Sequence, residues 1–215
     1  MTNSTGDTTV IAERRARAEK NDDYRNRRAV MLEQAALLFH TNGISETSVS
    51  DIAAAAGLDR ATVYYYFPNK EAIVAEVVRD AVIQSSSAIA AIANSDLAPA
   101  DKLRQMIVTS MQLFDRHYPH LLVFLREDMA RSVPESFLQW LMQNQQDSAT
   151  LWRGVIAEGL DSGVFDTSLG VDTLLSAVLG ALLWVARRYQ PDAGVDPEET
   201  GTGVARLLIN GLLSR

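Results

Sequence analysis

The sequence predicts an all-α fold in which a small N-terminal unit of three helices precedes a larger helical domain. Apolar residues recur three and four positions apart along most of the chain, which is the spacing of an amphipathic helix. No segment after residue 70 shows the alternation of apolar and polar side chains that is typical of a half-buried strand. Capping residues, glycines and prolines separate the apolar segments. We therefore assign residues 25–70 to the first domain and residues 71–215 to the second.

Length and composition limit the classes of protein to consider. The chain has 215 residues, of which 47% are hydrophobic, enough for one large domain or two small ones. It has no cysteine, which excludes disulfides, thiolate nucleophiles and cysteine-ligated zinc. The first residues lack the apolar core of a signal peptide, and no 18-residue apolar run is free of polar interruptions. We expect a soluble, cytoplasmic protein.

The net charge alone argues against a nucleic-acid partner, but its distribution does not. The net charge is −7 and the pI is about 5.0. Residues 10–30 nevertheless hold seven Lys and Arg against four acidic residues, whereas residues 81–215 hold ten against fifteen. The acidic side chains are therefore concentrated in the second domain.

Residues 1–24 are expected to be a disordered or basic extension, and residues 1 to about 9 are the part richest in Thr, Ser, Asn and Gly. The basic segment Arg14 to Arg28 either extends the first helix or forms an arm that reaches a nucleic-acid backbone. From Arg27 the helical pattern is clear, and Asn42-Gly43 ends it. Its apolar stripe consists of Leu32, Ala35, Ala36 and Phe39.

A helix-turn-helix follows the first helix. Ser48 and Asp51 have the spacing of a capping box, which satisfies free backbone amides at the start of a short helix. Gly57 supplies the left-handed backbone that ends this helix, and Asp59 is placed to cap a second helix. Two helices joined by so short a glycine turn form a motif that enters the major groove of DNA.

The second helix of the motif carries the residues expected to contact DNA. Its first turn, where a recognition helix approaches base edges, is formed by Arg60, Ala61 and Thr62. Three tyrosines with hydroxyls that can reach phosphate oxygens follow, namely Tyr64, Tyr65 and Tyr66. Successive helical residues point in different directions, so these three cannot all be core, whereas Val63 and Phe67 are expected to be buried.

A proline and a lysine follow this helix. Pro68 prevents its continuation, and Asn69 can cap the next helix. Lys70 then lies in the first turn of that helix, where a cation opposes the helix dipole. A phosphate bound at this point would offset both charges.

These residues resemble the DNA-binding domain of the TetR family of bacterial regulators. The family pattern is present in register at Thr47, Ser48, Ile52, Ala53, Ala56, Gly57, Thr62, Val63, Tyr64, Phe67, Pro68 and Lys70. The resemblance implies phosphate contacts from Thr47 or Ser48 and from Thr62, Tyr64, Tyr66 and Lys70. It implies base-edge readout from Arg60 and Ala61, with Tyr65 in either role.

The rest of the chain is expected to be helical. One helix covers residues 70–93, a second ends at Tyr118-Pro119, and a shorter one covers residues 121–131. A capping box formed by Ser132 and Glu135 is expected to open a long helix that Gly163 ends.

The last two helices have a different character. Residues 171–189 are apolar on nearly every side, so this helix must be buried on more than one face. Asp196-Pro197 then opens a closing helix. Two such helices from each of two subunits can close a four-helix bundle, which is how the family resemblance implies that a homodimer forms. A dimer would read a palindromic operator with half-sites about 34 to 36 Å apart.

Large side chains in the second domain are either ordinary core or, as the resemblance implies, the lining of a pocket for a small-molecule effector. The residues assigned to this pocket are Met111, Phe114, Tyr118, Phe124, Asp128, Trp152, Trp184 and Arg187. Further polar candidates are Gln112, Arg126, Arg131 and Asn144.

The C-terminal third is similar to TetR regulators tied to fatty-acid, steroid or other acyl-CoA catabolism. The residues that carry this resemblance are Trp184, Arg187, Tyr189-Gln190-Pro191 and the closing Asn210-Gly211-Leu212-Leu213. In that resemblance Arg187 and Arg188 meet the phosphates of a coenzyme A thioester, whereas the simpler interpretation is that they satisfy the helix dipole. We expect a repressor that a hydrophobic or acyl-CoA-type effector releases from DNA.

Two other classes of protein serve as alternatives. A small enzyme would use His117 and His120 with Glu127 and Asp128, but no His-Glu-x-x-His motif is present, and Pro119 separates the two histidines. The other alternative is a helical module that only binds proteins. We expect no catalytic residue, cofactor or metal.

Overall fold

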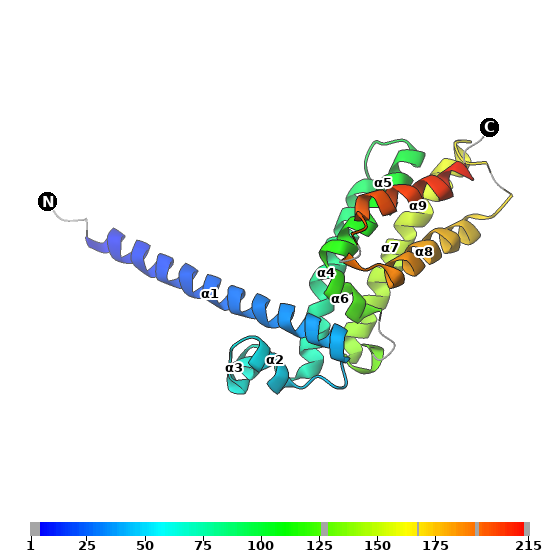
Figure 1. Cartoon of the computed structure of the whole chain (residues 1–215). Coiled ribbons are helices and arrows are strands. Elements are labelled where there is room, and N and C mark those ends of the chain that lie inside the picture. The colour runs from blue at the N-terminus through cyan, green and yellow to red at the C-terminus, as the bar shows by residue number, and fades with distance from the viewer. Residues whose placement is uncertain (1–4, 126–128, 167, 192–193, 213–215) are drawn as a thin grey trace.

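The computed structural model describes residues 5–125, 129–166, 168–191 and 194–212, with side chains from residue 22 onward. The regular structure within these ranges is helical, which confirms the all-α fold (Figure 1). The helices are α1 (Thr5–Asn42), α2 (Val49–Ala55), α3 (Arg60–Tyr66), α4 (Lys70–Ala93), α5 (Pro99–Arg116), α6 (Tyr118–Phe124), the 3-10 turn η1 (Met129–Arg131), α7 (Glu135–Asp161), α8 (Val171–Arg188) and α9 (Pro197–Asn210). No helix in the described ranges combines the length and apolarity that a membrane span requires.

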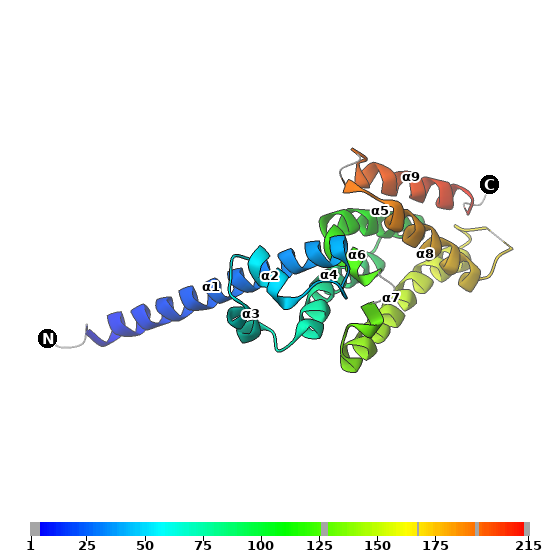
Figure 2. The same cartoon turned by 60° about the horizontal axis from the view of Figure 1, so that its bottom comes forward.

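The helices form two connected parts. Figure 1 shows α1 as a long rod whose C-terminal end joins α2 and α3, while α4 runs from these helices into a body formed by α5 to α9. In the turned view of Figure 2, α9 lies along α5 at the edge of this body. Gly201 permits that close approach, because a Cβ atom built there would lie 2.8 Å from the Cα atom of Val108.

The N-terminal part is held by a buried apolar cluster. Met31, Phe39, Ile52 and Val63 are inaccessible to solvent, so α1, α2 and α3 meet where their apolar stripes were predicted. The same cluster continues through α4 into Val123 of α6 and side chains of α7. The division of the chain at residue 70 therefore stays a prediction, since apolar packing crosses it.

The start of α1 differs from the expectation. The backbone is helical from Thr5, so α1 begins well before Arg27, where the helical pattern of the sequence becomes clear. Residues 1–4 lie outside the described range, and the assignment of residues 1–24 to an extension stays a prediction. Residues 10–28 contain many Ala, Arg, Glu and Lys and no proline, and extending an existing helix requires no new nucleus. Side chains before residue 22 are not described, so the proposed arm remains a prediction.

Three helix boundaries in the second domain differ from the expectation, two of them at prolines. Tyr118-Pro119 opens α6 instead of ending α5, because proline fits the first turn of a helix. The helix expected over residues 121–131 is wrong, since α6 ends at Phe124 and a 3-10 turn follows residues 126–128, which lie outside the described range. The capping box predicted before α7 is not formed. Pro134 is the capping residue, and it disfavours helical geometry at Val133.

The helix α8 is not enclosed within a single chain. Leu174, Val178 and Leu182 are buried against the body, as predicted for one face. The opposite face remains open, and Trp184 exposes 64% of its surface. The expected burial of α8 on more than one face therefore requires something outside this chain.

Candidate DNA-binding surface and effector cavity

The turn between α2 and α3 has the geometry that its sequence predicts. The Ser48 hydroxyl accepts a hydrogen bond from the Asp51 amide at 3.2 Å, and the Asp51 carboxylate accepts one from the Ser48 amide at 2.8 Å. Gly57 has a φ angle of 67°, and Asp59 accepts a hydrogen bond from the Thr62 amide at 2.7 Å. Hydrogen bonds from the Ser48 side chain and the Thr62 backbone hold the pKa values of Asp51 and Asp59, respectively, below their usual range.

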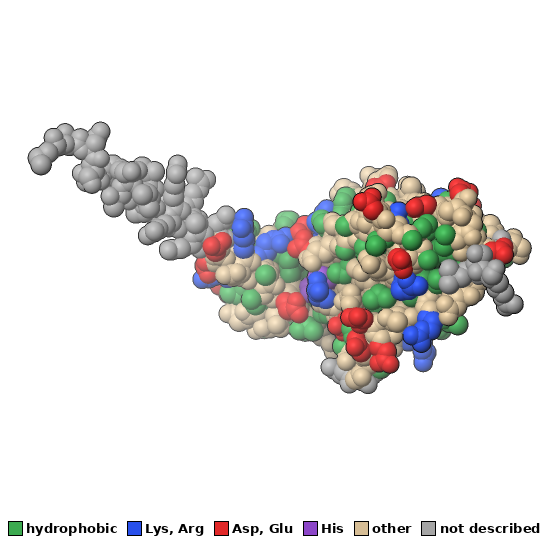
Figure 3. Space-filling view, turned by 90° about the horizontal axis from the view of Figure 1, so that it is seen from above, with side chains coloured by type: hydrophobic (Ala, Val, Ile, Leu, Met, Phe, Trp, Pro, Cys, Tyr) green, Lys and Arg blue, Asp and Glu red, His purple; other side chains and the backbone are tan. Residues whose placement is uncertain are grey.

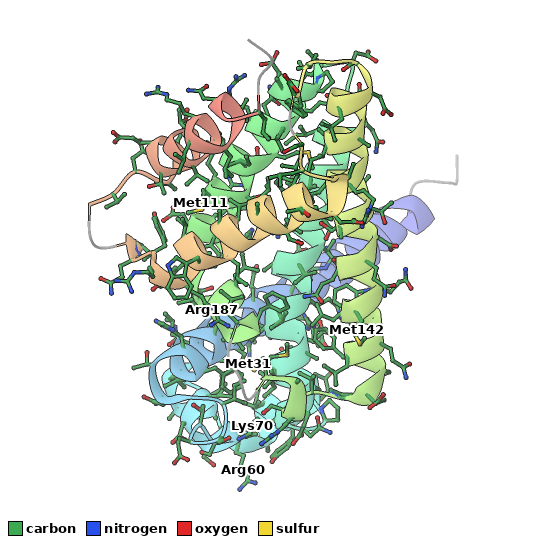
Figure 4. All side chains as sticks on the ribbon, turned by 90° about the vertical axis from the view of Figure 1, so that its right-hand side faces the viewer. Met31, Arg60, Lys70, Met111, Met142 and Arg187 are labelled. Carbon is green, nitrogen blue, oxygen red and sulfur yellow. The ribbon has the colours of Figure 1, made fainter. Side chains whose placement is uncertain are left out.

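The outer face of α3 carries the residues expected to read bases. Arg60 and Ala61 are exposed, and Thr62 is half-buried. The Arg60 Nη2 atom donates a hydrogen bond to the Tyr64 hydroxyl at 3.1 Å, and its guanidinium lies 5.3 Å from the centre of that ring. Figure 4 places Arg60 at the outer edge of the molecule. A guanidinium held along α3 in this way is available to a base edge or a phosphate.

The three tyrosines occupy three environments, as their helical spacing requires. Tyr64 and Tyr65 expose 41% and 76% of their surface, whereas Tyr66 is half-buried. Tyr66 stacks on Tyr24 of α1 with ring centres 4.5 Å apart, and Tyr65 meets the same ring edge-on at 6.3 Å. Sequence reasoning missed Tyr24, and no local pattern marks it, because its partners lie about 40 residues away.

Thr47 and Lys70 point inward. The Thr47 side chain is only 1% exposed, and its hydroxyl donates to the Gly43 carbonyl at 2.8 Å. Of the two alternatives for a phosphate contact, Ser48 is the exposed one. The Lys70 Nζ atom donates to the carbonyls of Ile44, Ser45 and Thr47 at 2.8, 3.3 and 3.0 Å. All three ammonium protons are thus occupied in holding the turn between α1 and α2, and a phosphate would have to displace one of them.

The two arginines at the start of the first predicted stripe also differ. Arg27 is exposed and pairs with Asp23 at 3.1 Å. Arg28 binds Glu76 of α4, and its guanidinium lies 5.3 Å from the centre of the Phe67 ring. Arg28 therefore ties α1 to α4, while Arg27 remains on the surface.

A cavity of about 510 Å³ lies between α4, α5, α6, α7 and α8. Four of the eight residues assigned to the effector line it, namely Met111, Phe114, Phe124 and Trp152. Tyr118 does not, because it packs edge-on between the rings of Phe114 and Tyr189. Asp128 lies outside the described residues.

Trp184 and Arg187 do not line this cavity, and their assignment to the effector stays a prediction. The residues of α8 that face the cavity are Leu179, Leu182, Leu183 and Ala186, which share one side of the helix. Trp184 and Arg187 project from a different side and are exposed. Figure 4 labels Arg187 near the C-terminal end of α8 and Met111 within the helical body. The spacing within α8 shows which residues share a side of the helix, but the sequence does not show which of these sides faces the cavity.

The polar lining was largely missed. Ser85 and Ser86 of α4 face the cavity, with Ser110 of α5 and Asn144 and Ser148 of α7. Asn144 was a candidate, whereas Gln112 instead binds Glu198 on the surface at 3.0 Å, and Arg131 is exposed. The available signal was the run of three serines, residues 85–87, directly before the wholly apolar stretch of residues 88–93.

Apolar side chains remain uncovered on the last two helices. Leu183 and Trp184 of α8 are 45% and 64% exposed, and Leu207 of α9 is 78% exposed. Figure 3 shows hydrophobic side chains in several patches on the face of the helical body that is seen from above. A second hollow of about 310 Å³ lies beside Trp184, between Arg188, Tyr189 and Thr200.

The histidines proposed for the enzyme alternative lie where α6 meets α1 and α4. The rings of His117 and His120 are 6.5 Å apart. His120 Nε2 lies 3.6 Å from a carboxylate oxygen of Glu33, and His117 Nε2 lies 3.2 Å from the Gln84 side-chain oxygen. Within the described part of the chain, no three His, Asp or Glu side chains are grouped as metal ligands.

Comparison with known proteins adds to this geometry. Residues 31–77 match the family model described as bacterial regulatory proteins of the tetR family, and residues 96–212 match a tetracyclin repressor-like C-terminal domain. The chain is 28% identical over 189 residues to the HTH-type transcriptional repressor KstR2 of Rhodococcus jostii, covering 87% of this chain and 92% of that protein.

Solved structures share the fold. The ketosteroid transcriptional regulator KstR2 of Mycobacterium tuberculosis superposes with a TM-score of 0.82 at 23% identity, over 88% of this chain and 96% of that one. AibR in complex with isovaleryl coenzyme A and operator DNA has a TM-score of 0.74 at 19% identity, over 85% and 98% of the two chains.

Proposed function

Because the chain belongs to the TetR family of bacterial regulatory proteins, we propose a specific form for its ligand-responsive, DNA-binding regulatory function. It acts in the cytoplasm as a homodimeric repressor of a palindromic operator, and a hydrophobic or acyl-CoA-type effector releases it.

The observation that carries this proposal is the course of α4. Its first residue, Lys70, holds the turn that leads into α2, and Ser85 and Ser86 of the same helix line the cavity. Fifteen residues of α-helix span about 22 Å, so one rigid element touches both sites. A ligand that moves α4 would therefore move the turn before α2 and, with it, the DNA-binding helices.

Contact with DNA is assigned to the exposed face of α3 and to the start of α2. Arg60 and Ala61 read base edges, while Ser48, Thr62 and Tyr64 bind phosphates. Tyr65 is the most exposed of the three tyrosines. Tyr66 packs against the same Tyr24 ring that Tyr65 contacts. We assign Lys70 to the support of the α1–α2 turn, because its three donors are already used there.

Dimerisation is assigned to α8 and α9. These helices expose Trp184 and Leu207 away from the cavity, and large aromatic side chains are enriched at the centres of interfaces. A twofold axis through such a surface would place two copies of α3 against two half-sites.

The cavity suits a ligand with a large apolar part, since its volume lies within the usual range for small-molecule sites. AibR, which shares the fold, binds isovaleryl coenzyme A, and the ketosteroid regulator KstR2 also shares the fold. The exposed Arg187 and Arg188 are available to phosphates outside the cavity.

The test is to incubate the purified protein with sheared DNA from its source and to sequence what it retains at moderate salt. A few promoter fragments that share one palindrome are expected. Arg60→Ala should abolish their selective retention, whereas Arg104→Ala, an exposed change on α5, should not. Retention without any shared sequence, or equal retention by the two variants, would contradict the proposal.

A further inference from the structure

The polar atoms of the cavity indicate the chemistry of the effector, and this inference rests on the proposed function. The described residues that line the cavity include no charged side chain. Their polar members are Ser85, Ser86, Ser110, Asn144, Gln145 and Ser148, and the remainder are apolar. A charged group placed among them would lose its hydration without gaining a counterion, which is costly.

Two of the serine hydroxyls are already bonded within the protein. Ser110 Oγ donates to the Met106 carbonyl at 2.7 Å. Ser86 Oγ lies 2.9 Å from the Val82 carbonyl and 2.8 Å from Asn144 Oδ1, and its single proton serves one of them at a time. These contacts place Asn144 of α7 against α4.

Ser85 is different, because its buried Oγ atom has no hydrogen-bond partner. A serine in a helix commonly donates to the carbonyl four residues earlier, as Ser86 and Ser110 do. A buried hydroxyl without a partner is destabilising and is rare in folded proteins. Rotation about the Cα–Cβ bond would turn this buried hydroxyl toward the cavity, where a ligand oxygen would supply the missing partner.

We propose that the part of the effector bound in this cavity is an uncharged, mainly apolar molecule with a hydroxyl or carbonyl oxygen that accepts a hydrogen bond from Ser85. The neighbouring amide of Asn144 gives the site a second neutral polar group. Any phosphate of a larger effector lies outside the cavity.

Four probes test the proposal: 1-decanol, 2-decanone, trans-decahydro-2-naphthol and decanoate at pH 8. Binding is measured by calorimetry and by tryptophan fluorescence, to which Trp152 in the lining contributes. The neutral probes are expected to bind at least about tenfold more tightly than decanoate. Ser85→Ala should weaken binding of the neutral probes about threefold to tenfold.

Ser87→Ala is the matched control, since Ser87 is exposed on the same helix and does not line the cavity. Ser85→Ala should also leave the thermal midpoint of the free protein unchanged or raised, because the lost hydroxyl has no partner there. A lowered midpoint would indicate a structural role for Ser85 and would count against the proposal.

Three results would overturn the inference: equal binding of the neutral probes to wild type and Ser85→Ala, tightest binding of decanoate, or binding of none of the four. Retention of operator DNA by the same protein preparations distinguishes a failure of this inference from a failure of the proposed function. If DNA is bound and no probe is, the inference fails alone. If the Ser85 effect is found but no neutral probe releases DNA, release by such a ligand fails and the cavity assignment stands.

Discussion

The helix-turn-helix and the cavity proposed to bind the effector are assembled from parts that lie at very different separations along the chain. The motif is contained in residues 47–70, whereas the cavity gathers side chains from Val82 to Ala186 on five helices. In the motif, helical spacing alone indicates which side chains of α3 point outward. In the cavity, the direction in which a side chain points depends on how its helix is rotated in the packed body.

Trp152 and Trp184 illustrate the difference. Both lie on long helices with apolar stripes, and both were assigned to the effector pocket. Trp152 is 3% exposed and lines the cavity, whereas Trp184 is 64% exposed and faces away from it. The lesson is that residue type and spacing identify a face, but contacts between distant helices decide what that face meets.

The largest effect is expected from Trp152→Ala. Removal of a buried tryptophan should lower the free energy of unfolding by about 3 to 5 kcal/mol, and the enlarged cavity should bind neutral probes differently. Urea denaturation measures the change. Met142→Ala on the same helix is the control, because Met142 is 61% exposed and should change stability by no more than about 0.5 kcal/mol. Similar losses for both variants would mean that Trp152 is not part of a packed lining.

The next largest effect is expected on dimer association through the exposed apolar side chains of α8 and α9. Leu207→Glu places a carboxylate in the proposed dimer interface and should weaken association about a hundredfold or more, because interface anchors are desolvated in the dimer. Sedimentation velocity measures association, and circular dichroism should show unchanged helix content. Gln146→Glu, an exposed change on α7, should leave association intact. A Leu207→Glu protein that remains dimeric would move the interface away from α9.

Features that depend on neighbouring residues were predicted correctly from the sequence, whereas features that depend on contacts between distant residues were missed. The caps at Ser48 and Asp59 and the turn at Gly57 involve neighbours within three residues, and all are present. One boundary failed at Pro119, where proline can either end a helix or open one. At Pro134 the helix opens as expected, but the proline itself is the capping residue and the predicted capping box is not formed. Ser85 was missed because only the absence of a partner, a property of the packed structure, distinguishes it.

Lys70 belongs to a dense local motif, yet its contacts indicate that it supports the turn between α1 and α2 instead of binding a phosphate. Lys70→Met removes three hydrogen bonds from an ammonium group and should lower stability by about 1.5 to 3 kcal/mol. Because the side chain supports the α1–α2 turn, operator affinity should fall while the slope of log affinity against log salt concentration stays the same. Fluorescence anisotropy across a salt series measures both quantities.

The alternative for Lys70 predicts a different slope. If each Lys70 of a dimer neutralised a phosphate, Lys70→Met would reduce the magnitude of the slope by about 2. Arg60→Ala provides the comparison, because an exposed arginine at DNA should change affinity without lowering the thermal midpoint. A reduced slope with unchanged stability for Lys70→Met would restore the phosphate contact implied by the family resemblance.

The smallest expected effect is a pH dependence at the junction of the two parts. Burial lowers the pKa of His120 from its usual value near 6.5, although Glu33 and Asp80 act in the opposite direction, and burial likewise lowers the pKa of His117. Between the lowered value and 6.5 the unfolded chain binds more protons than the folded one. The associated stability is therefore complete above pH 6.5 and decreases as the pH falls below it.

Thermal midpoints at pH 8.0 and pH 5.5 check this sign. The wild-type midpoint should fall at the lower pH by more than that of His120→Gln, which cannot titrate at this position. If His120→Gln loses as much stability as wild type over this range, other groups account for the decrease. The junction between α1 and α6 would then be insensitive to the charge of His120, and its contact with Glu33 would contribute packing alone.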